Sequence, residues 1–241
     1  MPTIEELTGE LFTRYGPRGW WPLLEWNEET QEWHCRYRPG DYIPPSEPLS
    51  CFEIGVGAIL TQNTAWKGVV HALINLKKAG LLHPRGLFEP GASEEIRRLI
   101  RPSGYFNQKQ MRLRGWAGFF LDLSGRTPER PDLLSLNGVG PETADSILLY
   151  AYGRPLFIAD AYARRIMGRF FRKDWNYDTL AEAANRSFEG LGEGDRLRMM
   201  GEAHALLVEH GKRFCRKKPD CGACFLRKAC PEAEKTCSCP S

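Results

Sequence analysis

One stretch near the middle of the chain decides the fold: residues 134–160, LSLNGVGPETADSILLYAYGRPLFIAD. Its first residues, 134–136, are typical of the end of a short helix. Residues 137–140 then predict a tight turn, in which Gly138 and Gly140 occupy the positions that most need a positive φ. Pro141 suits the first turn of a following helix, because its missing N–H costs nothing there.

The segment that follows Pro141 predicts a helix over 141–153, because Ala144, Ile147, Leu148 and Ala151 recur on one apolar face. Backbone N–H groups in a glycine turn and at a helix N-terminus can hold a phosphate without reading base sequence. A lone Gly-x-Gly turn is weak evidence for such a site. Asp160, eighteen residues after Glu142, strengthens it, because this acidic residue is placed to open a further helix.

These residues resemble the helix-hairpin-helix family of base excision DNA glycosylases, which includes endonuclease III. The family pattern, a glycine hairpin followed by Thr-Ala, a helix and an Asp, is matched by Leu136, Gly138, Val139, Gly140, Thr143, Ala144 and Asp160. The resemblance implies that the hairpin, about residues 134–150, binds DNA through Gly138, Val139, Gly140 and Thr143. It also implies that Asp160 is catalytic, whereas the residue alone would be interpreted as a plain N-cap.

A second motif lies near the C-terminus, in the pattern C-x5-C-x2-C-x5-C formed by Cys215, Cys221, Cys224 and Cys230. Four thiolates at short spacing in one loop suit a tetrahedral metal ion or an iron–sulfur cubane. A disulfide framework is disfavoured, because the chain shows no secretory signal and disulfides are rare inside cells. Endonuclease III-like proteins carry a 4Fe-4S cluster at C-x6-C-x2-C-x5-C, so the resemblance implies that cofactor here. The shorter first gap leaves zinc or an altered loop as alternatives.

The remaining cysteines are not expected to be ligands. Cys35 and Cys51 are interpreted as small apolar residues, and Cys237 and Cys239 as bystanders in the tail. The net charge of +3 is too small to indicate nucleic-acid binding by itself. Basic residues gather around the cysteine motif and at Lys109, Arg112 and Arg114, where they are candidate phosphate contacts.

The rest of the chain predicts an all-α protein. A capping box at Thr3-x-x-Glu6 predicts an N-terminal helix, and a second at Ser50-x-x-Glu53 predicts a helix that opens at 50. Further helices are expected at 64–80, 93–101, 107–123, 161–172, 178–189 and 193–212, whereas residues 23–49 predict an irregular connection. The resemblance implies a six-helix lobe at 50–154. A second lobe would combine 1–49 with 155–241 and carry the cysteine loop (215–230).

Two further segments match the family. Gln62, in the stretch ILTQNT, matches a Gln that fills the space left by a flipped nucleotide, and its amide offers both a donor and an acceptor to the orphaned base. The alternative is a helix cap and turn. Tyr105, in Gly-Tyr-Phe-Asn, matches a side chain that wedges between bases, with a core aromatic as the alternative.

Glu142 separates this chain from the glycosylase/lyases of the family. Those enzymes place a Lys at this position, whose amine forms a Schiff base with C1′ and permits strand cleavage. A carboxylate cannot do this, so the sequence predicts a monofunctional glycosylase that leaves an abasic site. Glu142 could otherwise be a first-turn Glu favoured by the helix dipole.

Trp20, Trp21 and Pro22 resemble a Trp-Trp-Pro motif of the 3-methyladenine DNA glycosylase III branch. Two longer stretches, 52–64 (FEIGVGAILTQNT) and 138–145 (GVGPETAD), match motifs of the same branch. The resemblance implies that Trp20, Trp21, Pro22 and Phe52 line the base pocket and that Glu142 sits at its edge. Trp residues next to the first helix would otherwise be interpreted as core.

These observations predict a monomeric, monofunctional DNA glycosylase that releases an alkylated purine of the 3-methyladenine type from double-stranded DNA. Asp160, ionised, would stabilise the oxocarbenium ion and orient the attacking water. Two alternatives stay open: a glycosylase for mismatched, uracil or oxidised bases, and a non-catalytic DNA-binding module. With no signal and no membrane-length apolar stretch, we expect a cytoplasmic, nucleoid-associated protein of prokaryotic source.

Overall fold

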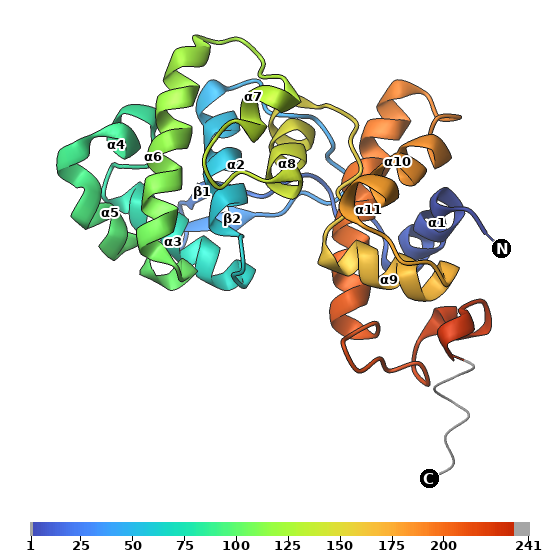
Figure 1. The fold of residues 1–241 in the computed structure, drawn as a ribbon. Helices are drawn as coiled ribbons and strands as arrows, with labels where there is room; N and C mark the ends of the chain where they lie inside the picture. The colour runs from blue at the N-terminus through green and yellow to red at the C-terminus, as the bar shows by residue number, and fades with distance from the viewer. Residues whose placement is uncertain (1, 234–241) are drawn as a thin grey trace. The chain divides into compact units, whose positions relative to one another are not determined.

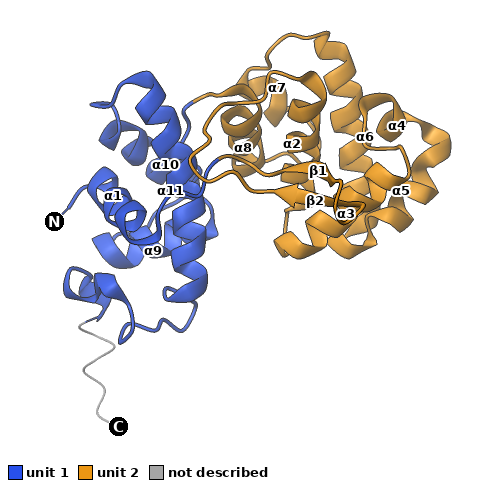
Figure 2. Ribbon diagram, turned by 180° about the vertical axis from the view of Figure 1, so that it is seen from behind, with its two compact units in different colours: residues 1–19, 155–241 blue, residues 20–154 orange. Residues whose placement is uncertain are grey.

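The computed structural model describes residues 2–233, and the chain divides into two compact units (Figures 1 and 2). Unit 1 comprises residues 1–19 and 155–241, and unit 2 comprises residues 20–154. The protein is predominantly helical, which confirms the predicted fold class. Among the described residues, no helix is both long enough and apolar enough to cross a membrane.

Unit 2 differs from the predicted lobe because residues 20–49 belong to it and not to the lobe formed by the chain ends. Two hydrogen bonds explain this placement. The Trp20 indole Nε1 donates to the carbonyl of Tyr150 at 2.8 Å, and the Leu24 N–H donates to the Glu53 carboxylate at 2.6 Å. Both bonds hold the early segment against helices of unit 2.

Unit 2 is built around one apolar helix. Its helices are α2 (Pro48–Leu60), α3 (Trp66–Lys78), α4 (Pro84–Phe88), α5 (Ser93–Leu99), α6 (Phe106–Leu123), α7 (Arg130–Leu134) and α8 (Pro141–Tyr152), with short 3-10 turns η1 (Pro90–Ala92) and η2 (Arg101–Ser103). Helix α2 packs against α3, α6 and α8 (Figure 1). Residues 51–60 of α2 are all buried, as expected of a helix that is apolar on every face.

Helix α2 does not start where the sequence predicted. It begins at Pro48, which occupies the first turn, and no side chain caps its N-terminus. The expected capping box at Ser50 is therefore wrong. Glu53, which was to complete that box, instead accepts the N–H of Leu24. Its carboxylate is buried, and burial raises its pKa.

A β-hairpin replaces part of the predicted irregular connection. Strands β1 (Leu23–Asn27) and β2 (Glu32–Arg36) pair antiparallel, with Trp26 opposite Trp33. The two indole rings contact each other at 5.5 Å between centroids, and the Lys77 ammonium of α3 lies 4.8 Å from the centre of the Trp33 ring. The strands are short and half-buried, so their alternation is too brief to be recognised in the sequence.

Unit 1 contains α1 (Ile4–Tyr15), α9 (Ala161–Phe171), α10 (Tyr177–Ser187), α11 (Glu193–Arg213) and the 3-10 turn η3 (Phe225–Lys228). The capping box of Thr3 and Glu6 is formed as predicted. Helix α11 carries the buried Glu202, whose carboxylate accepts the N–H groups of Arg18 and Gly19 at 2.8–3.0 Å. This carboxylate therefore fixes the chain just before the two tryptophans.

Close packing inside unit 2 gives the first testable prediction. A Cβ added at Gly55 would lie 2.3 Å from the Trp116 ring, which is itself fully buried. We expect Gly55→Ala to destabilise the protein by about 1–3 kcal/mol, because the ring cannot move away without disturbing the core. Thermal or urea unfolding measures the change.

Gly115→Ala is the matched control. Gly115 lies in α6 with nothing within 4 Å of the added Cβ, so alanine should leave stability unchanged or raise it by up to about 1 kcal/mol through helix propensity. Equal stability losses in the two variants would contradict the assignment of a packing role to Gly55.

Candidate functional site

The glycine hairpin joins α7 to α8 in unit 2. Gly138 has φ 78°, as the sequence predicted. Gly140 does not need a positive φ: it is the N-cap of α8, in extended conformation with φ −92°. No side chain caps this helix N-terminus. The hairpin therefore presents a glycine turn and a helix end, a combination suited to an anion.

The two helices of the hairpin are held together by an ion pair. Arg130 of α7 donates to both carboxylate oxygens of Asp145 in α8, at 2.6 and 3.2 Å. The Asp145 side chain is only 4% exposed, whereas that of Arg130 is 38% exposed, so the carboxylate is the buried end of the pair. Val139 is also buried. Asp145 thus has a structural part in the motif, and Val139 anchors the turn in the core.

Gln62 contacts the hairpin directly. Its Nε2 donates to the carbonyl of Gly138 and to the hydroxyl of Thr143, each at 2.9 Å. Its Oε1 accepts from Arg112 Nη1 at 2.5 Å. The amide therefore uses both its donors and its acceptor within the protein, and it would have to leave these partners to pair with a base.

Arg112 also explains why residue 138 is a glycine. A Cβ at Gly138 would lie 2.1 Å from the Nε of Arg112, in addition to straining a backbone at φ 78°. The guanidinium passes across the turn and reaches Gln62. Three sequence segments, 62, 112 and 138–143, therefore meet at one place in unit 2.

Tyr105 lies on the surface and not in the core, since its side chain is 66% exposed. Its backbone is left-handed, with φ 46° and ψ 33°, and it forms the N-cap of α6. A non-glycine residue in this conformation is uncommon and costs conformational energy. The turn that contains Gly104 and Tyr105 therefore presents an aromatic ring to solvent.

Asp160 lies in unit 1 at the N-terminus of α9. One carboxylate oxygen accepts the N–H of Ala163 at 2.7 Å, which is the N-cap bond that the sequence predicted. His204 of α11 lies 4.0 Å from the other oxygen. The residue is 6% exposed, and burial raises the pKa of its carboxyl to about 6. The backbone N–H groups of Ala163 and Tyr162 and the charge of Arg165 act in the opposite direction and lower this pKa.

Glu142 is an exposed residue in the first turn of α8. It belongs to unit 2, whereas Asp160 belongs to unit 1. The assignment of Glu142 to the edge of a base pocket stays a prediction.

The Trp-Trp-Pro motif packs on α2 and α8. Trp21 lies tilted against Tyr150 at 5.1 Å and edge-on to Trp66 at 5.5 Å, and it approaches Gly57 closely enough that a Cβ there would lie 3.1 Å from its ring. Trp20 is 7% exposed. Trp21 and Pro22 are half-buried, so these two can still offer surface to a ligand.

Phe52 is completely buried. Its ring stacks parallel to Trp116 at 6.1 Å and contacts Phe120 edge-on. In this structure the ring belongs to the core of unit 2. Trp20 and Trp21, by contrast, line a cavity of unit 2 that also borders Glu53, Arg36 and Lys77.

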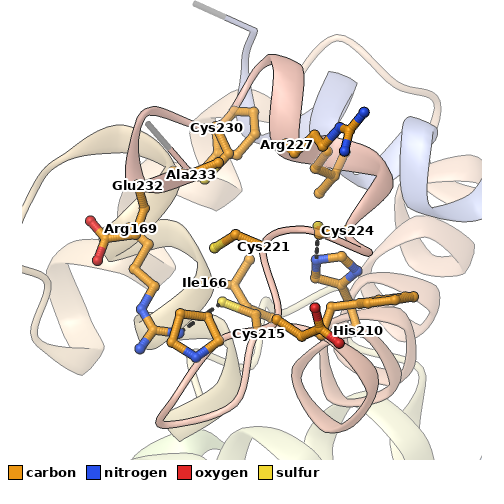
Figure 3. Close-up of a pocket in the computed structure, with 15 residues that line it drawn as sticks. Ile166, Arg169, His210, Cys215, Cys221, Cys224, Arg227, Cys230, Glu232 and Ala233 are labelled. Atoms are coloured by element: carbon orange, nitrogen blue, oxygen red, sulfur yellow. Dashed lines mark hydrogen bonds between the residues drawn. The ribbon is translucent and has the colours of Figure 1, made fainter. Parts of the chain in front are cut away.

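The four cysteines of the C-terminal motif line one pocket of unit 1 (Figure 3). Cys215 accepts a hydrogen bond from Arg169 Nη1 at 3.2 Å, and Cys224 Sγ lies 3.6 Å from His210 Nε2. Burial raises the pKa of Cys224 and Cys230, and the neighbouring thiols of the motif raise it further. The thiols therefore share one space and surround it from different sides (Figure 3).

Two candidate cofactors, a zinc ion and an iron–sulfur cubane, place different demands on these thiols. Within residues 2–233, no three His, Cys, Asp or Glu side chains are close enough to hold one metal ion. A tetrahedral zinc site would bring its thiolates to within about 4 Å of one another, because each lies about 2.3 Å from the metal. A cubane binds each thiolate to a different iron and so accepts wider spacing. The four thiols that line the pocket are a donor set of the kind that either group requires.

The remaining cysteines that the structure describes lie outside this pocket, and one of the predicted phosphate contacts is buried. Cys51 is buried, and its thiol bonds to the carbonyl of Ala151 at 3.2 Å. Cys35 is half-buried outside the pocket. Cys237 and Cys239 lie outside the described residues. The prediction that Lys109 contacts phosphate is wrong, because this side chain is 1% exposed.

Several contacts of these sites were not predicted from the sequence, although Arg112 itself was a candidate phosphate contact. Arg112, Arg130 and His204 are common residue types without a motif of their own, and each acts on a partner distant in sequence. Arg112 bonds to Gln62, which lies 50 residues earlier in the chain. His204 lies 4.0 Å from Asp160, which caps a different helix. No local pattern signals such contacts.

The comparisons with known proteins agree on one family. Residues 56–190 match the HhH-GPD superfamily of base excision DNA repair proteins. A Methanocaldococcus jannaschii protein named as a DNA repair glycosylase is 36% identical over 233 residues, which cover 91% of this chain and 92% of the relative. Endonuclease III homolog 1 of Arabidopsis thaliana is 30% identical over 85% of this chain and 54% of its own length.

Solved structures show the same fold at low identity. Endonuclease III in a non-covalent DNA complex aligns with a TM-score of 0.69 and 18% identity, over 98% of this chain and 99% of the other. The H. pylori 3-methyladenine DNA glycosylase bound to 1,N6-ethenoadenine aligns with a TM-score of 0.64 and 21% identity, over 88% and 98%. With the family match and the archaeal relative, these observations establish that the chain belongs to the HhH-GPD superfamily of base excision DNA repair proteins.

Proposed function

We propose that the protein is a monofunctional DNA glycosylase that hydrolyses the N-glycosidic bond of an alkylated purine in duplex DNA. The observation that carries this proposal is Asp160: a buried carboxylate, held by an N-cap bond, in a family whose members remove damaged bases. Burial makes the charge of this carboxylate strongly felt by a cation that develops beside it.

The chemistry follows from one negative charge and one water molecule. The bond between C1′ and the purine nitrogen breaks, and its electron pair leaves with the base. An alkylated purine is cationic before cleavage and departs neutral, so it needs little general-acid help. Asp160 stabilises the oxocarbenium ion at C1′ and orients the water, whose oxygen bonds to C1′ as a proton passes to Asp160 or to solvent.

The preference for an alkylated purine rests on aromatic surface. Trp21 is half-buried, with Tyr150 and Trp66 against its ring, so its orientation is fixed before a ligand arrives. A cationic base gains about 0.5–2 kcal/mol from each aromatic face that it meets, and a neutral base gains less. This difference would select damaged from normal purines.

Duplex DNA is the partner that the hairpin supports. The glycine turn at 138–140 and the N-terminus of α8 suit a backbone phosphate. Gln62 lies beside that turn, and Tyr105 is exposed. Both are proposed to enter the base stack, Gln62 at the place of the flipped nucleotide and Tyr105 as a wedge beside it.

A 4Fe-4S cluster is the cofactor that we assign to Cys215, Cys221, Cys224 and Cys230. Bound there, it would hold loop 215–230 in one conformation and take no part in the cleavage of the glycosidic bond. Arg169 would keep its bond to Cys215 Sγ, and its guanidinium also donates to the carbonyls of Arg216 and Lys217 at 2.7 and 2.9 Å. This side chain therefore supports the loop from α9.

Asp160→Asn should abolish base release from methylated DNA while the protein stays folded, because an amide oxygen can still cap α9. For the unaltered protein we expect kcat/KM to fall as the pH drops below about 6, since Asp160 has its pKa near 6 and acts in the ionised form. Asp122→Asn, which removes an exposed carboxylate, is the control. Full activity of Asp160→Asn would contradict the catalytic assignment.

The substrate and the absence of lyase activity are tested together on methylated DNA and on duplexes with a single uracil, oxidised base or mismatch. We expect release of 3-methyladenine, strand breaks only after alkali, and no complex trapped by borohydride, because residue 142 carries no amine. Release of a different base alone would discard the alkylpurine preference and keep the mechanism. Strand breaks without alkali would contradict the interpretation of Glu142.

The cluster is tested by composition and colour. The purified protein should be brown and contain iron and acid-labile sulfide in equal amounts. Cys221→Ser should lose both together with stability of the loop, whereas Cys35→Ser, a half-buried thiol outside the pocket, should keep them. Stoichiometric zinc without sulfide would overturn the cluster and leave the glycosylase assignment intact.

A further inference from the structure

Lys109 is a buried cation for which the described part of the chain, residues 2–233, provides no carboxylate partner. Its side chain lies in the first turns of α6 and is 1% exposed. The ammonium donates three hydrogen bonds: to the carbonyl of Leu60 at 2.8 Å, to the hydroxyl of Thr64 at 2.7 Å and to the carbonyl of Ser103 at 2.6 Å. Its three donors are matched by three neutral oxygen atoms.

The three acceptors belong to separate segments of unit 2. Leu60 is the last residue of α2, and its carbonyl has no acceptor role inside that helix, so the positive charge also meets the negative end of the α2 dipole. Thr64 belongs to the turn after α2, and Ser103 ends η2. The Thr64 hydroxyl also contacts the carbonyls of Gln62 and Ser103. One ammonium thus joins the end of a helix to two loops.

These loops carry the two side chains that are proposed to enter DNA. Gln62 lies between Leu60 and Thr64, and Tyr105 follows Ser103 by two residues. Tyr105 is held in a left-handed conformation, which persists only where its surroundings fix the backbone. The bonds of Lys109 lie on both sides of the gap between the two loops, so they set the distance between the loops.

A lysine suits this position better than an apolar residue. Without the ammonium, the carbonyls of Leu60 and Ser103 would be buried without this donor, which is costly. Burial, with a smaller effect from Arg112, lowers the pKa of Lys109 to about 8. The protein thus keeps a buried cation at this position that is stabilised by neutral oxygen atoms and by the α2 dipole. Stability alone does not require a buried cation at this position, which lies beside turns that are proposed to contact DNA.

We propose that Lys109 is a positioning residue for base flipping: it ties the Gln62 turn to the Tyr105 turn, so that both side chains enter the duplex together and in register. The inference rests on the proposed function only in that the protein binds duplex DNA and unstacks a base. It does not depend on which base is released.

The test uses a duplex that holds a stable abasic analogue opposite 2-aminopurine, whose fluorescence rises when it is unstacked. The unaltered protein should raise the fluorescence on binding. We expect Lys109→Met to bind this duplex with similar affinity and to weaken the insertion equilibrium about tenfold, because at least one of the two loops loses its tie. Lys78→Met, which alters an exposed lysine of α3, is the matched control.

A double-mutant cycle separates positioning from general destabilisation. In a protein that also carries Gln62→Ala and Tyr105→Ala, Lys109→Met should have no further effect on fluorescence, because the loops no longer have side chains to insert. An equal loss in both backgrounds would overturn the inference, and so would a full signal from folded Lys109→Met. No fluorescence change with the unaltered protein would overturn it as well.

Two further measurements keep the outcome decisive. If Lys109→Met does not fold, Thr64→Val is the second variant, because it removes one of the three acceptors of Lys109 and leaves the other two. It should give a smaller loss of 2-aminopurine fluorescence. An unchanged fluorescence signal would count against the inference. The duplex contains no base to be released. If the protein unstacks the probe but releases no base from any lesion, the proposed function alone is overturned. If Lys109→Met gives full fluorescence and releases base at the unaltered rate, this inference alone is overturned.

Discussion

The close approach of helix α2 to two tryptophan rings is the constraint on which the candidate DNA surface of unit 2 depends. Gly55 accepts Trp116, and Gly57 accepts Trp21. With larger residues the helix would move outward, and the turn at its C-terminus would move with it. That turn holds Gln62, which contacts the hairpin through its amide. Core packing and the position of a residue that is proposed to enter DNA are therefore linked in this protein.

Buried charge is the second recurring feature, and each case has a different partner. Glu202 is completely buried and accepts N–H groups from the segment before the tryptophans, and Glu53 accepts one from the segment after them. Both fix the backbone: the two oxygens of Glu202 accept from Arg18 and Gly19, and one oxygen of Glu53 accepts from Leu24. Asp160 has one oxygen on the N-cap bond and the other 4.0 Å from His204. Burial raises the pKa of Asp160 to about 6, and a buried carboxylate with a perturbed pKa is a candidate for action on a substrate.

The sequence predicted what repeats locally and missed what depends on distant partners. The long helices, the hairpin and the Asp160 cap follow from periodicity, glycine and capping residues, and the structure contains them. The β1–β2 hairpin was missed because its alternation is short and half-buried. The Ser50 capping box was wrong because the Glu53 carboxylate accepts a hydrogen bond from the N–H of Leu24, which lies 29 residues earlier in the chain. Lys109 was interpreted as a candidate phosphate contact because a single lysine in a helix gives no sign of three acceptors at the end of α2 and in two loops.

Lys109 does not supply the amine whose absence from position 142 underlies the proposal of a monofunctional enzyme. Position 142 carries a carboxylate, and Lys109 is a buried amine of the same unit. A Schiff base requires a free lone pair on nitrogen, but the ammonium of Lys109 spends all three protons on Leu60, Thr64 and Ser103. Even with its pKa near 8, the amine stays mostly protonated at neutral pH. Residue type alone therefore does not define a nucleophile: hydrogen-bonded on every proton, this lysine is an anchor, and Asp160 remains the group suited to the chemistry.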